Sequence, residues 1–396
     1  MNAGALCARH YETGAPVRLS WENGILTGLG ACPSAESDLW VAPALCDLQV
    51  NGFAGIDFQK DDLTAENLLW AVRQLRAAGC TRFFLTLITA PLDHLRHRLR
   101  HLQNLRRQST ELQAAIAGWH IEGPFLSPEP GFHGAHNPAW MCDPAPHHLR
   151  QLREITAPDP VLITLAPERP GALDAIALAV SLGFTVNLGH TNASIEILRQ
   201  AMAAGATGFT HLGNGCPRDL DRHDNILWRV FELPQLQVSL IPDRIHISPA
   251  LFRLMHRAID ADHIHYVSDA MSAAGAFAES PVPPDQPRRF TLGNLEVEVG
   301  PDQIVRQPGK SNFAGSALRP IDGVFRAAQM LDCPWQETWK RFSDQPARYV
   351  GLPAGMQTGQ RADFCLLRVD HRQACQELRI FVQGVEYSKT GDRKDS

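Results

Sequence analysis

Runs of apolar residues alternate with amphipathic segments along most of the chain, and this alternation predicts strands that are followed by helices. Amphipathic helices are expected at Thr64 to Ala78, where Leu68, Val72 and Leu75 share one face, and at Pro249 to Ile259. Such an order is typical of a parallel α/β fold. The predicted strands are Leu45 to Val50, Arg82 to Thr86, Ala115 to Ile121, Val161 to Leu165, Phe184 to Leu188, Gly208 to His211, Gln237 to Ile241 and Ile264 to Ser268.

Eight strand–helix units in roughly 300 residues match the size of a (β/α)8 TIM barrel, whose active site lies at the carboxyl ends of the strands. Residues able to bind metal or carry protons fall at these ends. Glu122 follows the third strand, His190 the fifth, His211 the sixth, His246 the seventh and Asp269 the eighth. Their agreement in position favours the barrel more than any single motif does.

The two ends of the chain have a different pattern, with short strand-like pieces around an Asn23-Gly24 turn. We predict that residues 1–43 and 357–396 together form a small β-sandwich domain and that residues 44–356 form the barrel. The terminal strands are expected at Val17 to Trp21, Asp363 to Val369 and Leu378 to Val382.

A hairpin insertion is predicted after the eighth strand, between about residues 276 and 316. The alternating segment Leu295 to Val299 has the pattern of a strand. It follows a proline-rich stretch that contains Pro281, Pro283, Pro284 and Pro287.

Composition sets the class of protein. The chain has 396 residues, of which 44% are hydrophobic, so it can bury a large core. The net charge is −5, without a long run of one sign, which argues against nucleic acid or an anionic membrane as a partner.

The nine cysteines are an odd number, scattered, and without a CxxC pair, which is typical of reduced thiols in an intracellular protein. The first residues lack a signal-peptide pattern, and no apolar run approaches the ~20 residues of a membrane span. We therefore expect a soluble, cytoplasmic protein.

One carboxylate and two imidazoles, from Glu122, His190 and His211, are the ligand set of a catalytic zinc that keeps a fourth position open. Taken singly, each histidine could equally be a core or capping residue. Their joint position with Glu122 at one end of the barrel favours the metal site, because a buried carboxylate without a partner is costly.

Eight short motifs then occur in a familiar order, and through them the chain resembles the N-acetylglucosamine-6-phosphate deacetylases of the amidohydrolase superfamily. The resemblance runs from about residue 43 to the C-terminal β segment. The motifs are Pro43-Ala-Leu-Cys-Asp-Leu-Gln-Val-Asn-Gly52, His120-Ile-Glu-Gly-Pro-Phe125, Gly134-Ala-His-Asn137, Gly189-His-Thr-Asn-Ala193, Thr210-His-Leu-Gly-Asn214, Ile245-His246, Ser268-Asp-Ala-Met-Ser-Ala-Ala-Gly275 and Ala314-Gly-Ser-Ala317.

This resemblance implies a metal-dependent barrel beside a β-sandwich, a homodimer, and cleavage of the acetamide of an amino-sugar phosphate. Many amidohydrolases bind a second metal through a His-x-His motif after the first strand, where this chain has Gln49-Val-Asn51. Neutral amides are poor zinc ligands, so one divalent ion per chain is predicted. Zinc is the expected ion, although the same ligands accept Fe2+, Co2+ or Mn2+.

The remaining polar residues receive roles in amide hydrolysis. Gln49 could orient the water, and Asn51 is a candidate substrate contact. Asp269 is the candidate proton carrier, since an amide needs both a base and an acid; its alternatives are a helix N-cap or a partner of a ligand histidine. His246 is expected to hydrogen-bond the substrate, with a plain core histidine as the alternative.

Substrate binding is predicted from the same resemblance. Arg222 matches the family's phosphate-binding arginine, although Arg218 and Arg229 lie close by in the sequence. Backbone donors are expected at Asn214 and Gly215. His136 matches a family position whose side chain can reach the phosphate bound in the partner subunit.

Several departures from the family's motifs leave the identity of the sugar open. Gly213-Asn-Gly-Cys216 removes bulk near the substrate, and the loop from Pro128 to His133 offers no lysine. The first hypothesis is a metal-dependent deacetylase of an N-acetylhexosamine 6-phosphate in amino-sugar catabolism. The second is an amidohydrolase for another N-acyl amino sugar or a cyclic amide, and the third is a catalytically silent barrel that binds a sugar phosphate.

Overall fold

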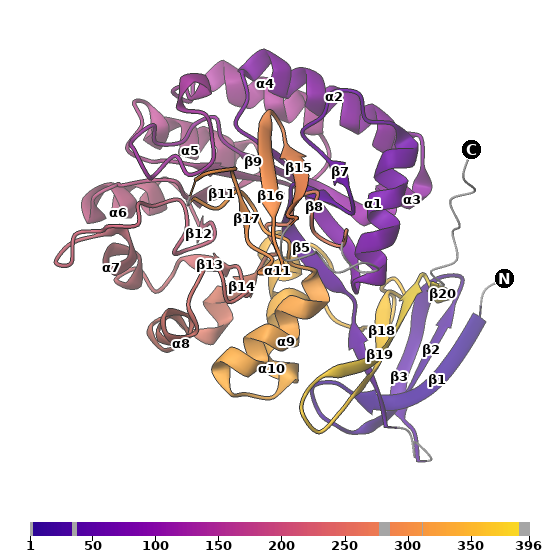
Figure 1. Cartoon of the computed structure of the whole chain (residues 1–396). Helices are drawn as coiled ribbons and strands as arrows, with labels where there is room; N and C mark the ends of the chain where they lie inside the picture. The colour runs from indigo at the N-terminus through magenta and orange to yellow at the C-terminus, as the bar shows by residue number, and fades with distance from the viewer. Residues whose placement is uncertain (1–2, 34–37, 277–285, 311, 388–396) are drawn as a thin grey trace.

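A barrel of eight parallel strands forms the centre of the molecule in the computed structural model, which describes every residue except 1–2, 34–37, 277–285, 311 and 388–396 (Figure 1). The strands follow one another in chain order, and all eight predicted strands are present. Val50 bridges Ala270 in parallel and closes the ring. The strands are β5 (Leu45–Val50), β8 (Cys80–Ile88), β9 (Ile116–Glu122), β10 (Val161–Leu165), β11 (Phe184–Leu188), β12 (Gly208–Phe209), β13 (Gln237–Leu240) and β14 (Ile264–Tyr266).

Helices surround the barrel in the ring seen in Figure 1. Both helices predicted from periodicity are confirmed to within one residue at each end. The helices are α1 (Ala65–Ala77), α2 (Leu92–Arg107), α3 (Thr110–Ala115), α4 (Pro146–Thr156), α5 (Ala172–Ser181), α6 (Ile195–Ala203), α7 (Ile226–Phe231), α8 (Pro249–Ala258), α9 (Pro320–Leu331), α10 (Trp335–Phe342) and α11 (Asp344–Tyr349).

Local capping sets where these helices begin. At α1, the Thr64 hydroxyl accepts a hydrogen bond from the Asn67 N–H at 3.2 Å, and the Asn67 side chain accepts one from the Thr64 N–H at 3.0 Å. At α8, the Ser248 hydroxyl accepts from the Leu251 N–H, and Pro249 occupies the first turn.

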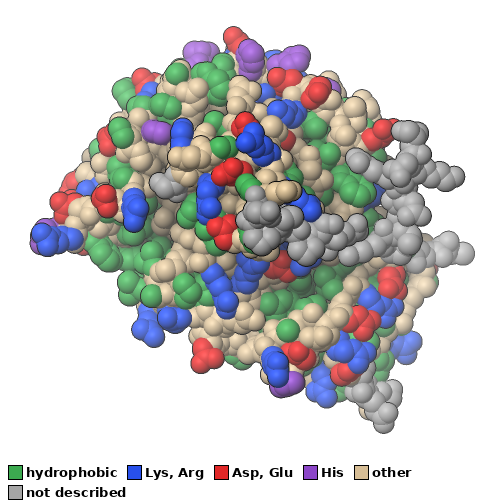
Figure 2. Space-filling model, in the orientation of Figure 1, with side chains coloured by type: hydrophobic (Ala, Val, Ile, Leu, Met, Phe, Trp, Pro, Cys, Tyr) green, Lys and Arg blue, Asp and Glu red, His purple; other side chains and the backbone are tan. Residues whose placement is uncertain are grey.

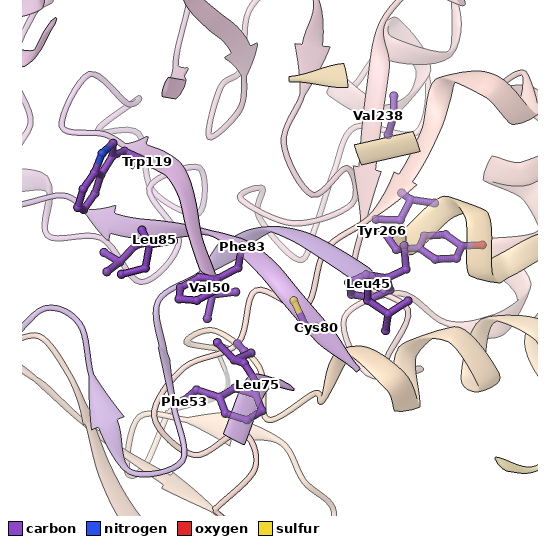
Figure 3. Close-up of a cluster of buried hydrophobic side chains, with 14 of the residues drawn as sticks. Leu45, Val50, Phe53, Leu75, Cys80, Phe83, Leu85, Trp119, Val238 and Tyr266 are labelled. Carbon is purple, nitrogen blue, oxygen red and sulfur yellow. The ribbon is translucent and has the colours of Figure 1, made fainter. Parts of the chain in front are cut away.

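The largest hydrophobic core lies between the barrel and its helices. Figure 3 shows Leu45 and Val50 of β5, Phe83 and Leu85 of β8, and Leu75 of α1 in this layer. A smaller apolar cluster, with members such as Cys46, Leu48 and Phe84, comes from the same strands. On β8 the two clusters alternate, with Phe83 and Leu85 in the larger one and Phe84 in the smaller one.

Strands from both ends of the chain share one seven-stranded sheet, in the order β20-β19-β18-β4-β1-β2-β3. It lies at the lower right of Figure 1, beside the barrel. The predicted terminal strands are present, and Asn23 and Gly24, both at positive φ, form the turn. The division into two domains stays a prediction. The strands are β1 (Ala3–His10), β2 (Pro16–Glu22), β3 (Ile25–Ala31), β4 (Leu39–Pro43), β18 (Phe364–Val369), β19 (Cys375–Val382) and β20 (Val385–Tyr387).

The expectation that all cysteines are free thiols is wrong for one pair, because Cys7 and Cys32 form a disulfide with a Cα–Cα distance of 6.2 Å. Cys7 lies on β1 and Cys32 directly follows β3, and both strands flank β2. A pairing across a sheet leaves no mark in the spacing of cysteines along the chain. The other seven cysteines are free.

In the region where a hairpin insertion was predicted, the chain forms a three-stranded antiparallel sheet of β15 (Arg288–Leu292), β16 (Leu295–Val299) and β17 (Val305–Arg306). Its buried face packs Val297 and Val299 against Met271 and Ala314. The prolines at 281, 283 and 284 lie outside the described residues.

Acidic and basic side chains are interspersed on the face of the molecule shown in Figure 2. This distribution agrees with the small net charge of −5. No helix in the described part of the chain has the length and apolar character needed to cross a membrane.

Candidate functional site

A cavity of about 1040 Å³ opens where the barrel strands end at their carboxyl side. Glu122, His190, His211, His246 and Asp269 all line it, so the structure brings together the five residues that the sequence placed at strand ends. Leu292 and Leu295 of the insertion line it as well, which makes the inserted sheet one of its walls. Of the other predicted site residues, Asn51, His136, Asn214 and Gly215 also line the cavity.

Three of these residues lie just beyond their strands with left-handed backbones: φ is +51° at His190, +32° at His211 and +51° at Asp269. A residue other than glycine keeps such a conformation only where its surroundings hold it, at a cost of about 1–3 kcal/mol. The His211 N–H is held by the Ser239 hydroxyl at 2.7 Å. Such strained positions cluster at functional sites.

Glu122 is the centre of a buried carboxylate–imidazole cluster. Its Oε1 lies 2.7 Å from His211 Nε2 and 3.4 Å from His190 Nε2. Burial alone would raise the pKa of Glu122, but its contacts with His190 and His211 outweigh burial and hold the pKa well below its usual range. The carboxylate is therefore ionised, as a metal ligand must be.

The orientation of His190 suits metal binding. Its Nδ1 lies 2.8 Å from the carbonyl oxygen of Phe132, and a carbonyl can only accept, so Nδ1 carries the proton. The lone pair is then on Nε2, which faces Glu122. A backbone carbonyl that fixes the tautomer is the usual support for a ligand histidine.

His136 lies closer to this cluster than the sequence indicated. Potential ligand atoms of Glu122, His136 and His190 all lie within 4.8 Å of one another, and the His136 ring is centred 4.5 Å from the His190 ring. Burial, reinforced by His190, lowers the pKa of His136 to about 3 and keeps it neutral. The resemblance predicts that His136 contacts a phosphate, and nothing in the sequence of its loop indicates a position beside Glu122.

The residues present fit a divalent cation. Ionised Glu122 and the imidazoles of His136, His190 and His211 offer oxygen and nitrogen donors of the kind that zinc and related ions take. His211 Nδ1 has no hydrogen-bond partner among the described residues.

Asp269 is tied to the same cluster through two amides. Gln49 Nε2 donates to Glu122 Oε1 and to Asp269 Oδ1, each at 3.1 Å, and Asn51 Nδ2 donates to Asp269 Oδ1 at 2.7 Å. Burial, followed by the charge of Glu122, raises the pKa of Asp269 to about 6. A carboxyl with this pKa can both take up and release a proton near neutral pH.

His246 has a dedicated carboxylate partner. Its Nδ1 lies 2.6 Å from Asp243 Oδ2, while Asp243 Oδ1 accepts the N–H groups of Ile245 and His246 at 2.8 Å. Burial would lower the pKa of His246, but Asp243 outweighs it and raises the pKa above its ordinary value. His246 therefore differs from a plain core histidine, because Asp243 favours the protonated form of its ring at the cavity wall.

Two glycines leave room for the His190 ring. A Cβ added at Gly215 would lie 2.8 Å from His190 Nδ1, and one added at Gly134 would lie 3.0 Å from Cε1. The sequence prediction for Gly215 concerned substrate binding, and the structure adds this steric role.

A hydrogen-bonded chain inside the barrel supports the strands that carry the site, and the sequence analysis missed it. His120 Nε2 lies 2.8 Å from the Thr164 hydroxyl, which lies 2.7 Å from the Thr210 hydroxyl; Asn187 Nδ2 then donates to Thr210 at 3.1 Å. The available signal was the period of two that puts His120 on the same side of β9 as Glu122.

The two arginines that follow β12, Arg218 and Arg222, differ in their relation to the cavity. Arg222 is exposed and is not among the residues that line the cavity, whereas Arg218 is. The phosphate role of Arg222 stays a prediction.

Fold and site together define a class: a (β/α)8 amidohydrolase whose candidate metal centre lies at the carboxyl ends of the barrel strands. A comparison with models of known protein families finds no match. The chain is 30% identical to an N-acetylglucosamine-6-phosphate deacetylase of Vibrio furnissii over 322 residues, which cover 81% of this chain and 76% of that protein. It belongs to the N-acetylglucosamine-6-phosphate deacetylase family.

Further comparisons agree. The Bos taurus enzyme of the same name is 30% identical over 347 residues, covering 83% of this chain and 79% of the relative. A solved structure of a Mycobacterium smegmatis N-acetyl-D-glucosamine-6-phosphate deacetylase mutant, in complex with N-acetyl-D-glucosamine-6-phosphate, superposes with a TM-score of 0.85. It is 28% identical, and the match covers 98% of this chain and 100% of that one.

Proposed function

We propose that this protein hydrolyses the acetamide of N-acetylglucosamine 6-phosphate to glucosamine 6-phosphate and acetate, as a metal-dependent enzyme of cytoplasmic amino-sugar catabolism. The observation that carries the proposal is the meeting of Glu122, His190, His211 and Asp269 in one cavity. A regulatory barrel without activity would have no need to keep a carboxyl with a pKa of about 6 beside a metal-binding cluster.

The proposed centre holds one divalent ion, with zinc the expected metal, on Glu122, His190 and His211. His136 is a further donor close enough to take part. Such an ion acts as a Lewis acid that polarises the amide carbonyl and makes water more acidic. Gln49 and Asn51 supply no imidazole for a second ion, so metal analysis should find about one ion per chain, and two would contradict this assignment.

Asp269 carries the proton in this proposal. Its carboxylate takes a proton from the attacking water as the new C–O bond forms, and then delivers it to the sugar nitrogen as the C–N bond breaks. Both amide donors, Gln49 and Asn51, bind Oδ1, and no described residue hydrogen-bonds Oδ2. The amides thus hold the carboxylate in one orientation and leave Oδ2 for proton transfer.

His246 stabilises the substrate. In its protonated form, which Asp243 favours, the ring binds Asp243 through Nδ1 and has its Nε2–H left to donate to the amide oxygen or to a sugar hydroxyl. Backbone groups of Asn214 and Gly215 are the proposed contacts for the rest of the sugar.

An acetate-release assay across N-acetylhexosamines, with and without a 6-phosphate, tests the reaction directly. Release from N-acetylglucosamine 6-phosphate supports the proposal. Release only from another N-acyl sugar favours the second hypothesis. Binding of a sugar phosphate without release of acetate would favour the third hypothesis, the catalytically silent barrel.

We further propose a homodimer. Trp228 on α7 is 42% exposed and Leu254 on α8 is 43% exposed, and their neighbours Leu227 and Leu251 line the cavity. Exposed large apolar side chains near such a cavity-lining segment suit a protein interface. Light scattering that gives the mass of a single chain would contradict the dimer.

A further inference from the structure

The cavity has two electrically different parts. Its floor consists of Glu122, His190, His211 and Asp269, together with Gln49, which is bound to both carboxyl groups; all are buried except Asp269, which is partly exposed. Its rim carries the cationic side chains of Arg218 and Lys310. We keep the names floor and rim for these two sets.

The two rim cations come from separate parts of the chain. Arg218 lies in the loop between β12 and α7, and Lys310 lies in the segment that follows β17 of the inserted sheet. Both side chains are exposed, and both belong to the lining of one cavity. Among the described residues that line the cavity, Arg218 is the one arginine and Lys310 is the one lysine.

These two cations lack the partners that nearby arginines have. Arg229 binds Asp224 at 2.7 and 2.9 Å, and Arg306 binds Asp302 at 2.7 Å. Within the part of the chain that the structure describes, no hydrogen bond or ion pair engages the side chain of Arg218 or Lys310. The positive charge at the rim is therefore free to meet an anionic ligand.

The floor determines which end of an anionic ligand lies deepest in the cavity. In the proposed reaction the acetamide lies there, within reach of the ion held by Glu122, His190 and His211 and of the Asp269 carboxyl group. In an N-acetylhexosamine 6-phosphate, the acetamide on C2 and the phosphate on C6 are at opposite ends of the sugar ring. An acetamide on the floor therefore carries the phosphate toward the rim.

We propose that Arg218 and Lys310 bind the phosphate of the substrate and set the preference for a phosphorylated sugar. The inference rests on the proposed function and assigns its anion site to residues of the same chain. Guanidinium suits two parallel hydrogen bonds to phosphate, and the lysine adds a point charge from another segment of the chain. Lys310 also gives the inserted sheet a part in recognition. Arg222, which the resemblance favoured, lies outside this cavity lining.

The test compares Arg218→Met, Lys310→Met and the double variant, which remove charge while keeping length. Lys340→Met on α10 is the control, because it makes the same charge change away from the cavity. The readout is the ratio of kcat/KM for N-acetylglucosamine 6-phosphate to that for N-acetylglucosamine. We expect roughly a ten- to hundredfold fall of this ratio in each single variant, mainly through KM, and none in the control.

A ratio that stays at the control level in the double variant would overturn the proposal, as would a fall confined to Arg222→Met. Calorimetry with inorganic phosphate separates this inference from the proposed reaction. Weaker phosphate binding in the double variant supports the rim site even if the wild-type protein releases no acetate. Unchanged phosphate binding rejects it even if the wild-type protein is an active deacetylase.

Discussion

The floor and the rim of the cavity differ in how the chain holds its charged groups. On the floor, Glu122 and Asp269 are bound by amides or imidazoles from other strands before any ligand arrives. On the rim, Arg218 and Lys310 are exposed and unpartnered within the described structure. The floor is thus preorganised for one chemistry, whereas the rim depends on its ligand for partners. We expect substitutions on the floor to affect the chemical step and those on the rim to affect the choice of substrate.

Glu122→Gln should have the largest effect, because it removes the only carboxylate from the proposed ligand set. A catalytic metal contributes several kcal/mol, so at about 1.4 kcal/mol per factor of ten the activity should fall by about 10³-fold or more. Metal content measured on the purified variant should fall with it. Because the contacts of Glu122 with His190 and His211 outweigh the cost of its burial, the metal-free variant should also unfold at a lower temperature than the metal-free wild type. A variant that kept both metal and activity would show that Glu122 is not a ligand.

Asp269→Asn should act on chemistry alone. General acid–base catalysis contributes about 10²–10⁴-fold, and kcat should fall by that amount while metal content stays near the wild-type value. The measurement is kcat together with metal content on the same preparation. Full activity in this variant would mean that another group moves the proton.

The floor could be predicted from the sequence because it is tied to strand ends. Each of Glu122, His190 and Asp269 follows an apolar run. In a (β/α)8 barrel the carboxyl ends of all strands lie at the same end of the barrel, so these residues are expected to lie together. The sequence could not show that Gln49 bridges Glu122 and Asp269, since that contact depends on side-chain reach across the barrel.

The rim was predicted less well, for physical reasons. Loops have no periodicity, so neighbouring arginines such as Arg218 and Arg222 look equivalent in the sequence. Lys310 comes to the cavity only because the inserted sheet folds back over the barrel end, as Leu292 in the same lining shows. The Cys7–Cys32 disulfide was missed for a similar reason, because it joins residues 25 positions apart across a sheet.

Gly215→Ala would test whether the floor tolerates any change in its packing. The new Cβ would lie 2.8 Å from His190 Nδ1, so the ring must move and its bond to the Phe132 carbonyl must weaken. Loss of such an outer contact typically costs about 10–100-fold in metal affinity. Metal affinity, measured by competition with a chelator, should fall in this range.

Gly213→Ala is the matched control for that change. Gly213 lies in the same loop, also at positive φ, but a Cβ there would meet Met255 at 3.2 Å instead of His190. Equal losses of metal affinity in the two variants would show that loop strain, and not the His190 contact, is responsible.

Asp243→Asn should have the smallest effect, because it changes a group that supports His246 without touching the proposed ligands. Without the carboxylate, burial dominates and the pKa of His246 should fall below its ordinary value. The ring of His246 then loses its positive charge at neutral pH and donates a weaker hydrogen bond from Nε2, so kcat/KM should fall about tenfold.

The pH dependence of this variant follows from the sign of each shift. In the wild type, the pKa of His246 is raised, so its stabilising contribution is complete below the ordinary histidine pKa of 6.5 and is lost as pH rises through the raised value. The pKa of Asp243 is lowered, so its contribution is present above 3.8 and is lost as pH falls through the lowered value. The stability that Asp243→Asn loses should therefore be largest between about pH 3.8 and about pH 6.5. The fall of kcat/KM on the alkaline side should move to lower pH. NMR titration of the His246 ring checks the cause, because an unchanged pKa in the variant would mean that Asp243 does not hold the proton on this histidine.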